Sequence, residues 1–251
     1  MKKFRLIARL DVKNEFVIKG IHLEGLRKVG NPNQLASNYY QDGIDEIFFM
    51  DAVASLYQRN NIFHIIQRAC AEVFIPITIG GGIRSIDDIQ NALRTGADKV
   101  ALNTQAIKTP ELIEEASMKF GRQCIVGSIE AKRKGNSWEA YIENGRESTG
   151  VDVIEWATKL ETLGVGELII TSVDQEGTKK GCDISLMKSV CSRTNVPVIA
   201  SGGIGTVSHL VDICQKTQID GVALASVLHY NTHAIRDLKI ELMKRNISVR
   251  L

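Results

Sequence analysis

The sequence contains an approximate internal repeat of nearly half its length. Segments of the first half return in the second half in the same order, at separations of 119 to 122 positions. The clearest is residues 75–83 (IPITIGGGI), which return as residues 196–204 (VPVIASGGI). The other pairs are 10–13 with 129–132, 45–48 with 166–169, and 98–104 with 220–226. A repeat of this period predicts a chain made of two similar halves.

Each half contains short runs rich in β-branched residues, and helical patterns separate them. This alternation is typical of βα units that form a parallel sheet. The eight expected strands lie near residues 5–11, 46–51, 75–79, 98–103, 124–130, 167–173, 196–201 and 219–225. With a length of 251 residues, they predict an α/β fold, a single (β/α)8 TIM barrel over residues 1–251 built from two duplicated half-barrels. An alternating run at residues 134–150 predicts a β-hairpin after the fifth strand.

The charge balance and the cysteines exclude several classes of partner. The 31 basic and 29 acidic residues leave a formal net charge of +2, which provides no broad positive field for nucleic acid or an anionic membrane. The five cysteines are an odd number without C-x-x-C spacing, which favours small core residues in a cytoplasmic protein over disulfides or a metal site. We therefore expect a small-molecule ligand, with no nucleic acid, membrane or metal.

Two glycine runs occupy equivalent positions in the two halves. Each follows an apolar strand and precedes a helix, so backbone N–H groups and a helix N-terminus meet at the carboxyl ends of the strands, where phosphate is favoured. The expected phosphate-binding residues are Gly81, Gly82, Asn103 and Thr104 in the first half and Gly202, Gly203, Ala225 and Ser226 in the second. Two such sites predict a substrate with two phosphate-like ends. Tight turns that bind nothing are the alternative interpretation of these glycines.

Two acids also follow the repeat. Asp11 ends the first expected strand and Glu130 ends the fifth. Because the repeat places these strands on opposite sides of the barrel, we expect the two carboxylates to face one cavity. Two acids in different environments can act as general acid and general base, and salt bridges to nearby lysines are the structural alternative. Thr171 and Ser201, at the ends of the sixth and seventh strands, are expected to offer hydroxyl groups to substrate or phosphate.

Several motifs together resemble one known family. They are LDVK at 10–13, VIKG at 17–20, GGGIR at 80–84, GADKV at 96–100, TSVDQEGTK at 171–179 and ASGG at 200–203. With them the chain resembles the cyclase subunit of imidazole glycerol phosphate synthase, from Arg5 to the C-terminal SVRL. The resemblance implies a cofactor-free lyase of histidine biosynthesis. In that reaction, ammonia from a separate glutaminase subunit and a bisphosphorylated formimino-carboxamide ribonucleotide give imidazole glycerol phosphate and aminoimidazole carboxamide ribonucleotide.

The resemblance also implies roles for residues away from the two acids. The charges that match the ammonia gate of the family are Arg5, Glu46, Lys99 and Glu167. A structural ring of salt bridges is the alternative for them. The glutaminase is implied to dock on this N-terminal face of the barrel, with Asp98 in the interface. Lys19, expected on a mobile loop after the first strand, would close over the substrate and exclude water, and a surface lysine is its alternative.

Three residues depart from the family pattern. Glu130 and Glu176, the latter expected in the substrate site, stand where the family usually has aspartate, and Arg9 stands where it usually has a small residue. Strand alternation places Arg9 on the inward face of the barrel, where a guanidinium needs an acidic partner because it cannot lose its charge. Glu130 is the expected partner, with Asp11 or Asp51 as alternatives. We hypothesise that Arg9 and Glu130 are linked changes that reshape the second acid and narrow the path of ammonia.

Several functions fit these residues. The ammonia-dependent cyclase is favoured by the retained motifs. A paralogous synthase subunit, which uses ammonia to convert the acetamido group of a nucleotide-linked sugar into an acetamidino group, is favoured by Arg9, Glu130 and Glu176. A sister phosphoribosyl sugar isomerase shares the duplicated barrel but needs no ammonia, and the gate-like charges argue against it. A non-catalytic barrel that only activates the glutaminase is disfavoured, because glutamate at position 130 keeps an ionisable group.

Overall fold

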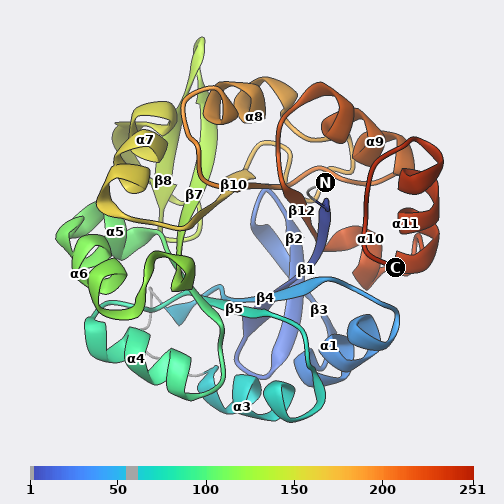
Figure 1. Cartoon of the computed structure of the whole chain (residues 1–251), viewed down its shortest axis with the longest axis horizontal. Helices are drawn as coiled ribbons and strands as arrows, with labels where there is room; N and C mark the ends of the chain where they lie inside the picture. The colour runs from blue at the N-terminus through green and yellow to red at the C-terminus, as the bar shows by residue number, and fades with distance from the viewer. Residues whose placement is uncertain (1–2, 55–61) are drawn as a thin grey trace.

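The computed structural model describes residues 3–54 and 62–251 as a closed parallel barrel surrounded by helices (Figure 1). The strands pair in the order β10, β11, β12, β1, β4, β5, β6 and β7, and β7 pairs with β10 to close the barrel. They are Arg5–Lys13 (β1), Glu46–Asp51 (β4), Ile77–Gly80 (β5), Lys99–Leu102 (β6), Ile125–Lys134 (β7), Glu167–Ser172 (β10), Val198–Ser201 (β11) and Gly221–Leu224 (β12). All eight expected strands are present, and the predicted (β/α)8 barrel is confirmed.

The strands are apolar on both faces because each face is covered. Their outward side chains, such as Leu6 and Leu168, pack under the helices in the larger hydrophobic core. Their inward side chains form a smaller apolar layer inside the barrel, which consists of Ile7, Phe48, Met50, Ala101, Val126, Ile169, Ile199 and Ala223. The barrel interior is therefore filled by side chains below the carboxyl ends of the strands.

The helices cover the outside of the barrel in chain order. Ser85 begins α4 with a capping box and Thr206 caps α9, as N-cap preferences predict. The helices are Pro32–Gln41 (α1), Phe63–Glu72 (α3), Ile86–Arg94 (α4), Thr104–Lys108 (α5), Glu111–Phe120 (α6), Val153–Leu163 (α7), Ile184–Cys191 (α8), Val207–Lys216 (α9), Ser226–His229 (α10) and Ile235–Lys244 (α11). Within residues 3–54 and 62–251, none of the helices is long and apolar enough to span a membrane.

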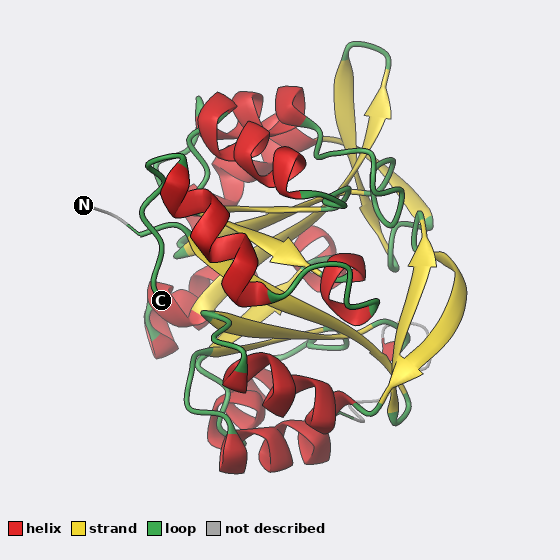
Figure 2. Cartoon of the chain, turned by 90° about the vertical axis from the view of Figure 1, so that its right-hand side faces the viewer, coloured by secondary structure: helices red, strands yellow, loops and turns green. Residues whose placement is uncertain are grey.

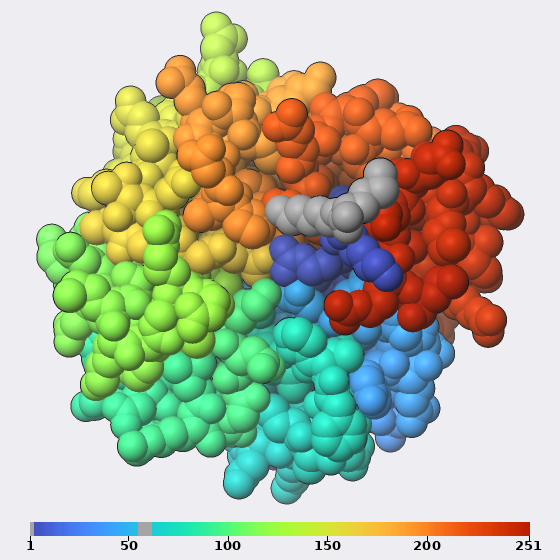
Figure 3. Space-filling model, in the orientation of Figure 1, coloured from blue at the N-terminus to red at the C-terminus, as the bar shows by residue number. Residues whose placement is uncertain are grey.

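Two antiparallel extensions stand at one end of the barrel, and the chain termini lie at the other end (Figure 2). The expected hairpin after the fifth strand is larger than predicted, since β7 continues into it and pairs with Ser137–Ile142 (β8), which pairs with Glu147–Asp152 (β9). A second extension, Phe16–Ile21 (β2) and Glu24–Gly30 (β3), follows β1. Seen from the end with the termini, successive segments follow one another around the barrel (Figure 3).

Candidate active site

A buried arginine lies at the centre of the site. Arg9 is 2% exposed, and its Nε donates a hydrogen bond to Asp11 Oδ1 at 2.8 Å. The inward orientation expected for Arg9 is therefore correct, but the expected pairing with Glu130 is wrong. Alternate residues of one strand lie side by side on the same face, so Asp11 meets the guanidinium directly.

The two hydroxyl groups expected to serve the substrate contact Arg9. Arg9 Nη1 donates to Thr171 Oγ1 at 2.8 Å and to Ser201 Oγ at 3.1 Å. These contacts hold the guanidinium across the barrel, from β1 to β10 and β11. Its third nitrogen, Nη2, is buried and has no hydrogen-bond partner among the described residues. Buried donors are normally paired, so Nη2 is an exception among the described residues.

Asp11 is surrounded by positive charge. Lys19 Nζ lies 3.8 Å from Asp11 Oδ2, on the side opposite to the Arg9 contact with Oδ1. Burial alone would raise the pKa of Asp11, but the charges of Arg9 and then Lys19 outweigh burial and hold this pKa below its ordinary value. Asp11 is therefore an anion throughout the neutral range.

Lys19 lies in a strand and is buried. It belongs to β2 rather than to the expected loop, and it is 4% exposed, so the alternative of a surface lysine is excluded. Its ammonium pairs with Glu176 as well as with Asp11. Burial lowers the pKa of Lys19 to about 8, since the attraction of Asp11 compensates only part of the lost hydration.

The β2–β3 hairpin is fastened to the loop after β10, which keeps Lys19 in the site. At its tip, His22 N donates to the carbonyl oxygen of Glu176 at 2.8 Å. The ring Nδ1 of His22 lies 3.0 Å from the carbonyl oxygen of Val173. Gly177 has φ +75°, and a Cβ there would lie 2.3 Å from the carbonyl oxygen of Gly20. The close approach of these two segments therefore requires glycine at position 177.

Glu130 has a different environment from Asp11. Its Oε2 accepts hydrogen bonds from Asn103 Nδ2 at 3.0 Å and from the backbone N–H of Gly145 at 2.7 Å. It forms no ion pair with any residue in the described ranges. Burial raises the pKa of Glu130 to about 7, and the more distant charge of Arg9 only partly opposes this effect. The two acids therefore differ in protonation at neutral pH.

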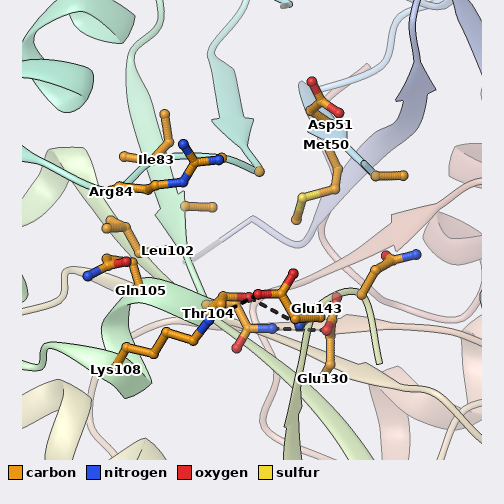
Figure 4. A pocket seen from close by; sticks show the side chains of 16 residues that line it. Met50, Asp51, Ile83, Arg84, Leu102, Thr104, Gln105, Lys108, Glu130 and Glu143 are labelled. Atoms are coloured by element: carbon orange, nitrogen blue, oxygen red, sulfur yellow. Dashed lines mark hydrogen bonds and ion pairs between the residues drawn. The ribbon is translucent and has the colours of Figure 1, made fainter. Parts of the chain in front are cut away.

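A cavity of about 320 Å³ opens beside Glu130 (Figure 4). It brings together the expected phosphate-binding residues of the first half with further charged residues that sequence reasoning did not assign to the site. Gly81 has φ +91°, and a Cβ would lie 2.2 Å from the carbonyl oxygen of Asp51, so a side chain at position 81 would not fit. The charged, polar and glycine residues in the lining of this cavity include Asp51, Gly81, Gly82, Arg84, Asn103, Thr104, Lys108, Glu130 and Glu143.

The turn between β8 and β9 folds into this cavity, which the sequence did not predict. Glu143 N donates to Thr104 Oγ1 at 3.1 Å, and Lys108 Nζ lies 3.2 Å from Glu143 Oε1 (Figure 4). Glu143 Oε2 is buried and has no hydrogen-bond partner in the described parts of the chain. Glu143 and Asn144 have positive φ values of 52° and 59°. The Asn-Gly pair at 144–145 signals such a turn, but not its direction.

A second cavity lies behind the other glycine run. It is a small cavity of about 20 Å³ whose lining includes Glu176, Lys179 and the four phosphate-binding residues expected in the second half, which are Gly202, Gly203, Ala225 and Ser226. Gly203 has φ +90°, and a Cβ would lie 1.9 Å from the carbonyl oxygen of Gly181. Lys179 supplies a cation that sequence reasoning did not assign to this site. The structure thus places both glycine runs beside cavities at the same end of the barrel as Glu130.

The charges expected as an ammonia gate form a closed ring at the other end. Arg5 Nη1 lies 2.7 Å from Glu46 Oε1, and Arg5 also pairs with Glu167. Lys99 Nζ lies 3.0 Å from Glu46 Oε2 and 2.9 Å from Glu167 Oε2. Each cation therefore contacts both anions. Nearby, Asp98 Oδ2 accepts a hydrogen bond from Ile77 N at 2.8 Å, so this carboxylate joins β5 to the start of β6.

A histidine missed by sequence reasoning packs near Asp11. His229 is 8% exposed, and its Nδ1 lies 2.8 Å from the hydroxyl oxygen of Tyr39. Burial and, after it, the charge of Lys19 lower the pKa of His229 to about 4. The ring is therefore neutral at physiological pH and adds no charge to the site. No motif or spacing in the sequence distinguished this histidine from a core residue.

These features define the class of protein as a (β/α)8 barrel whose candidate active site lies at the carboxyl ends of its strands. Residues 5–234 match the model of a family described as "Histidine biosynthesis protein". The chain is 58% identical over 206 residues to the imidazole glycerol phosphate synthase subunit HisF of Legionella pneumophila, which covers 82% of this chain and 97% of the relative.

Two further relatives carry the same name over nearly the whole chain. HisF of Lactococcus lactis subsp. cremoris (strain SK11) is 47% identical over 249 residues, 98% of this chain and 96% of the relative. HisF of Methanococcus maripaludis (strain C5) is 45% identical over 268 residues, with 98% of each chain covered. The chain therefore belongs to the histidine biosynthesis protein family, among the HisF subunits of imidazole glycerol phosphate synthase.

Proposed function

We propose that this chain is the ammonia-using cyclase subunit that converts a bisphosphorylated formimino-carboxamide ribonucleotide into imidazole glycerol phosphate and aminoimidazole carboxamide ribonucleotide. The observation that carries the proposal is the pair of buried acids with different partners, Asp11 beside two cations and Glu130 beside neutral donors. Two cavities behind glycine turns support a substrate with a phosphate at each end.

The two acids suit the proton transfers of this reaction. Closing an imidazole ring with ammonia requires proton removal from the attacking nitrogen and protonation of the groups that leave. Asp11, kept ionised by Arg9 and Lys19, is suited to orient the attacking nitrogen and to stabilise the positive charge that develops on it. Glu130, with its pKa near 7, is suited to accept a proton and to donate it to a leaving group. Lys19 and Glu176 would close the site under the β2–β3 hairpin and exclude water.

The N-terminal face is the proposed docking surface for a separate glutaminase. The relatives are named as the HisF subunit of a synthase. This name is consistent with a second subunit that binds the barrel. The closed ring of Arg5, Glu46, Lys99 and Glu167 lies at this face, and we propose it as the gate for ammonia. Asp98 lies at the same end and is proposed to contact the partner.

Turnover with ammonia alone tests the function. The purified chain is mixed with the formimino ribonucleotide and an ammonium salt at alkaline pH, and imidazole glycerol phosphate is measured. We expect product from the natural chain and none from Asp11→Asn. If the natural chain makes no product even with a cognate glutaminase and glutamine, the proposal is wrong.

Arg9 favours a second candidate, in which the acceptor of ammonia is a nucleotide-linked acetamido sugar. Its buried guanidinium pairs with Asp11 at a position where the resemblance implies a small residue, and this difference beside Asp11 favours an acceptor other than the ribonucleotide. Incubation with such a sugar, ammonium salt and mass spectrometry would reveal an amidine in place of the amide. Product there, and none with the formimino ribonucleotide, would establish the second candidate.

A further inference from the structure

We propose that Arg9 is a positioning residue that keeps Asp11 ionised and thereby leaves Glu130 as the rim acid that carries the exchangeable proton. The proposal rests on the proposed function for its meaning in turnover, but its geometry does not depend on the substrate. In this proposal, Arg9 makes the two acids differ in protonation. Neither the fold nor the family resemblance implies this role for Arg9.

Arg9 contacts Asp11 directly but does not contact Glu130. The guanidinium is 2% exposed and binds Asp11 at 2.8 Å, while Thr171 and Ser201 fix its other edge. Both hydroxyl acceptors are 1% exposed, so little room is left for the guanidinium to swing toward Glu130. Because arginine stays protonated in proteins, Asp11 has a permanent positive neighbour and Glu130 has none in direct contact.

Other charged and titratable groups around the two acids strengthen the same division. Lys19, from β2, faces Asp11, although Glu176 neutralises much of its charge. His229, from α10, is neutral near pH 7 because burial lowers its pKa to about 4. Glu143, from the β8–β9 turn, opposes ionisation of Glu130, as does Asp11 itself. Burial, Asp11 and Glu143 therefore favour the protonated form of Glu130 and outweigh the charge of Arg9 and the Gly145 N–H, which favour its ionised form.

Infrared titration of the whole chain tests the proposal without any substrate. The absorption of a protonated carboxyl group is followed between pH 4 and 9, with the range chosen around the pKa of about 7 for Glu130. We expect one buried carboxyl group to titrate near neutrality. Glu130→Gln should remove this transition, whereas Glu241→Gln, a surface control on α11, should leave it unchanged.

Replacing Arg9 and replacing Asp11 should shift the titration of Glu130 in opposite directions. Arg9→Met removes a positive charge that acts on both acids, so the Glu130 transition should shift up by about one pH unit and protonated Asp11 should appear. Asp11→Asn removes a negative neighbour and releases the guanidinium, so the transition should shift down. Arg9→Lys should keep most of the natural behaviour.

The outcomes separate this proposal from the proposed function. A transition that disappears in Asp11→Asn, or one that Arg9→Met leaves unmoved, would overturn the role of Arg9 even if the chain makes imidazole glycerol phosphate. Conversely, if the shifts occur as expected but the chain does not make imidazole glycerol phosphate, the role of Arg9 is supported and the proposed function is wrong. If Arg9→Met does not fold, Asp11→Asn still decides, since an unmoved or upward-shifted transition there would also contradict the proposal.

Discussion

The N-terminal end of the barrel and its C-terminal end both contain clustered charges, but only in the N-terminal cluster does every charged side chain contact its opposites. There, Arg5 and Lys99 each contact both Glu46 and Glu167. At the C-terminal end, Asp11 contacts Arg9 and Lys19, and Glu176 pairs with Lys19. Glu130 lies in the same site but contacts no cation among the described residues, and its hydrogen bonds come from neutral donors.

This difference separates a stable arrangement from a reactive one. A closed ring of alternating charges has no reason to change protonation, so it can stay the same through a reaction cycle. At the C-terminal end, Glu130 exchanges its proton easily, because burial away from any direct cation partner in the described residues places its pKa near 7. Replacing one side chain at each end should therefore have different consequences for turnover, stability and pH dependence.

The largest expected effect is on turnover at the rim. Glu130→Gln should lower kcat with ammonium salt by about a hundredfold or more, because the group that exchanges the proton is lost. Glu241→Gln, the same replacement on the surface of α11, should leave kcat unchanged. Steady-state kinetics at saturating substrate measures the effect. If the Glu130→Gln variant keeps the natural kcat, Glu130 does not exchange a proton during turnover.

The next effect is on the ring. Lys99→Met should lower the free energy of unfolding by about 2 kcal/mol, because two partly buried carboxylates then share one cation. The double variant Lys99→Met and Glu46→Gln restores the balance of charge and should recover part of the loss. Denaturant unfolding measures both variants. If the single variant is as stable as the natural chain, the ring contributes nothing to stability.

The last effect is confined to part of the pH range. The pKa of Glu130 is about 7 in the folded chain, above its ordinary value of 4.5, so the folded chain holds a proton that the unfolded chain has released. The stability that this proton provides is complete below pH 4.5 and is lost as the pH rises to 7. Glu130→Gln mimics the protonated acid and should raise the free energy of unfolding by up to about 3 kcal/mol at pH 8, with little effect at pH 4. An equal effect at both pH values would contradict the assignment.

The barrel could be predicted because its signals are periodic. The eight strands appear as apolar runs at regular spacing, and the glycine turns recur with the repeat, so their ends meet at one rim. The charge ring was located through the family resemblance, and its members do start four strands. The roles of these residues in binding and catalysis remain predictions.

The errors concern choices that periodicity does not settle. Arg9 could be placed inside the barrel, but whether it meets Asp11 or Glu130 depends on reach and on the hydroxyl groups opposite. The β2–β3 hairpin was taken for a loop because β3 is largely exposed and therefore carries little apolar alternation. The inward turn at Glu143 depends on backbone conformations with positive φ.

The position of Lys19 on the β2–β3 hairpin links movement to charge. Lys19 reaches Asp11 and Glu176 only while the tip of the hairpin is bonded to the loop after β10. Lifting the hairpin would withdraw an ammonium group and leave a more acidic chamber, which repels phosphorylated molecules. Product departure and hairpin opening would then assist each other, and the next anionic substrate would be held once the ammonium group returned.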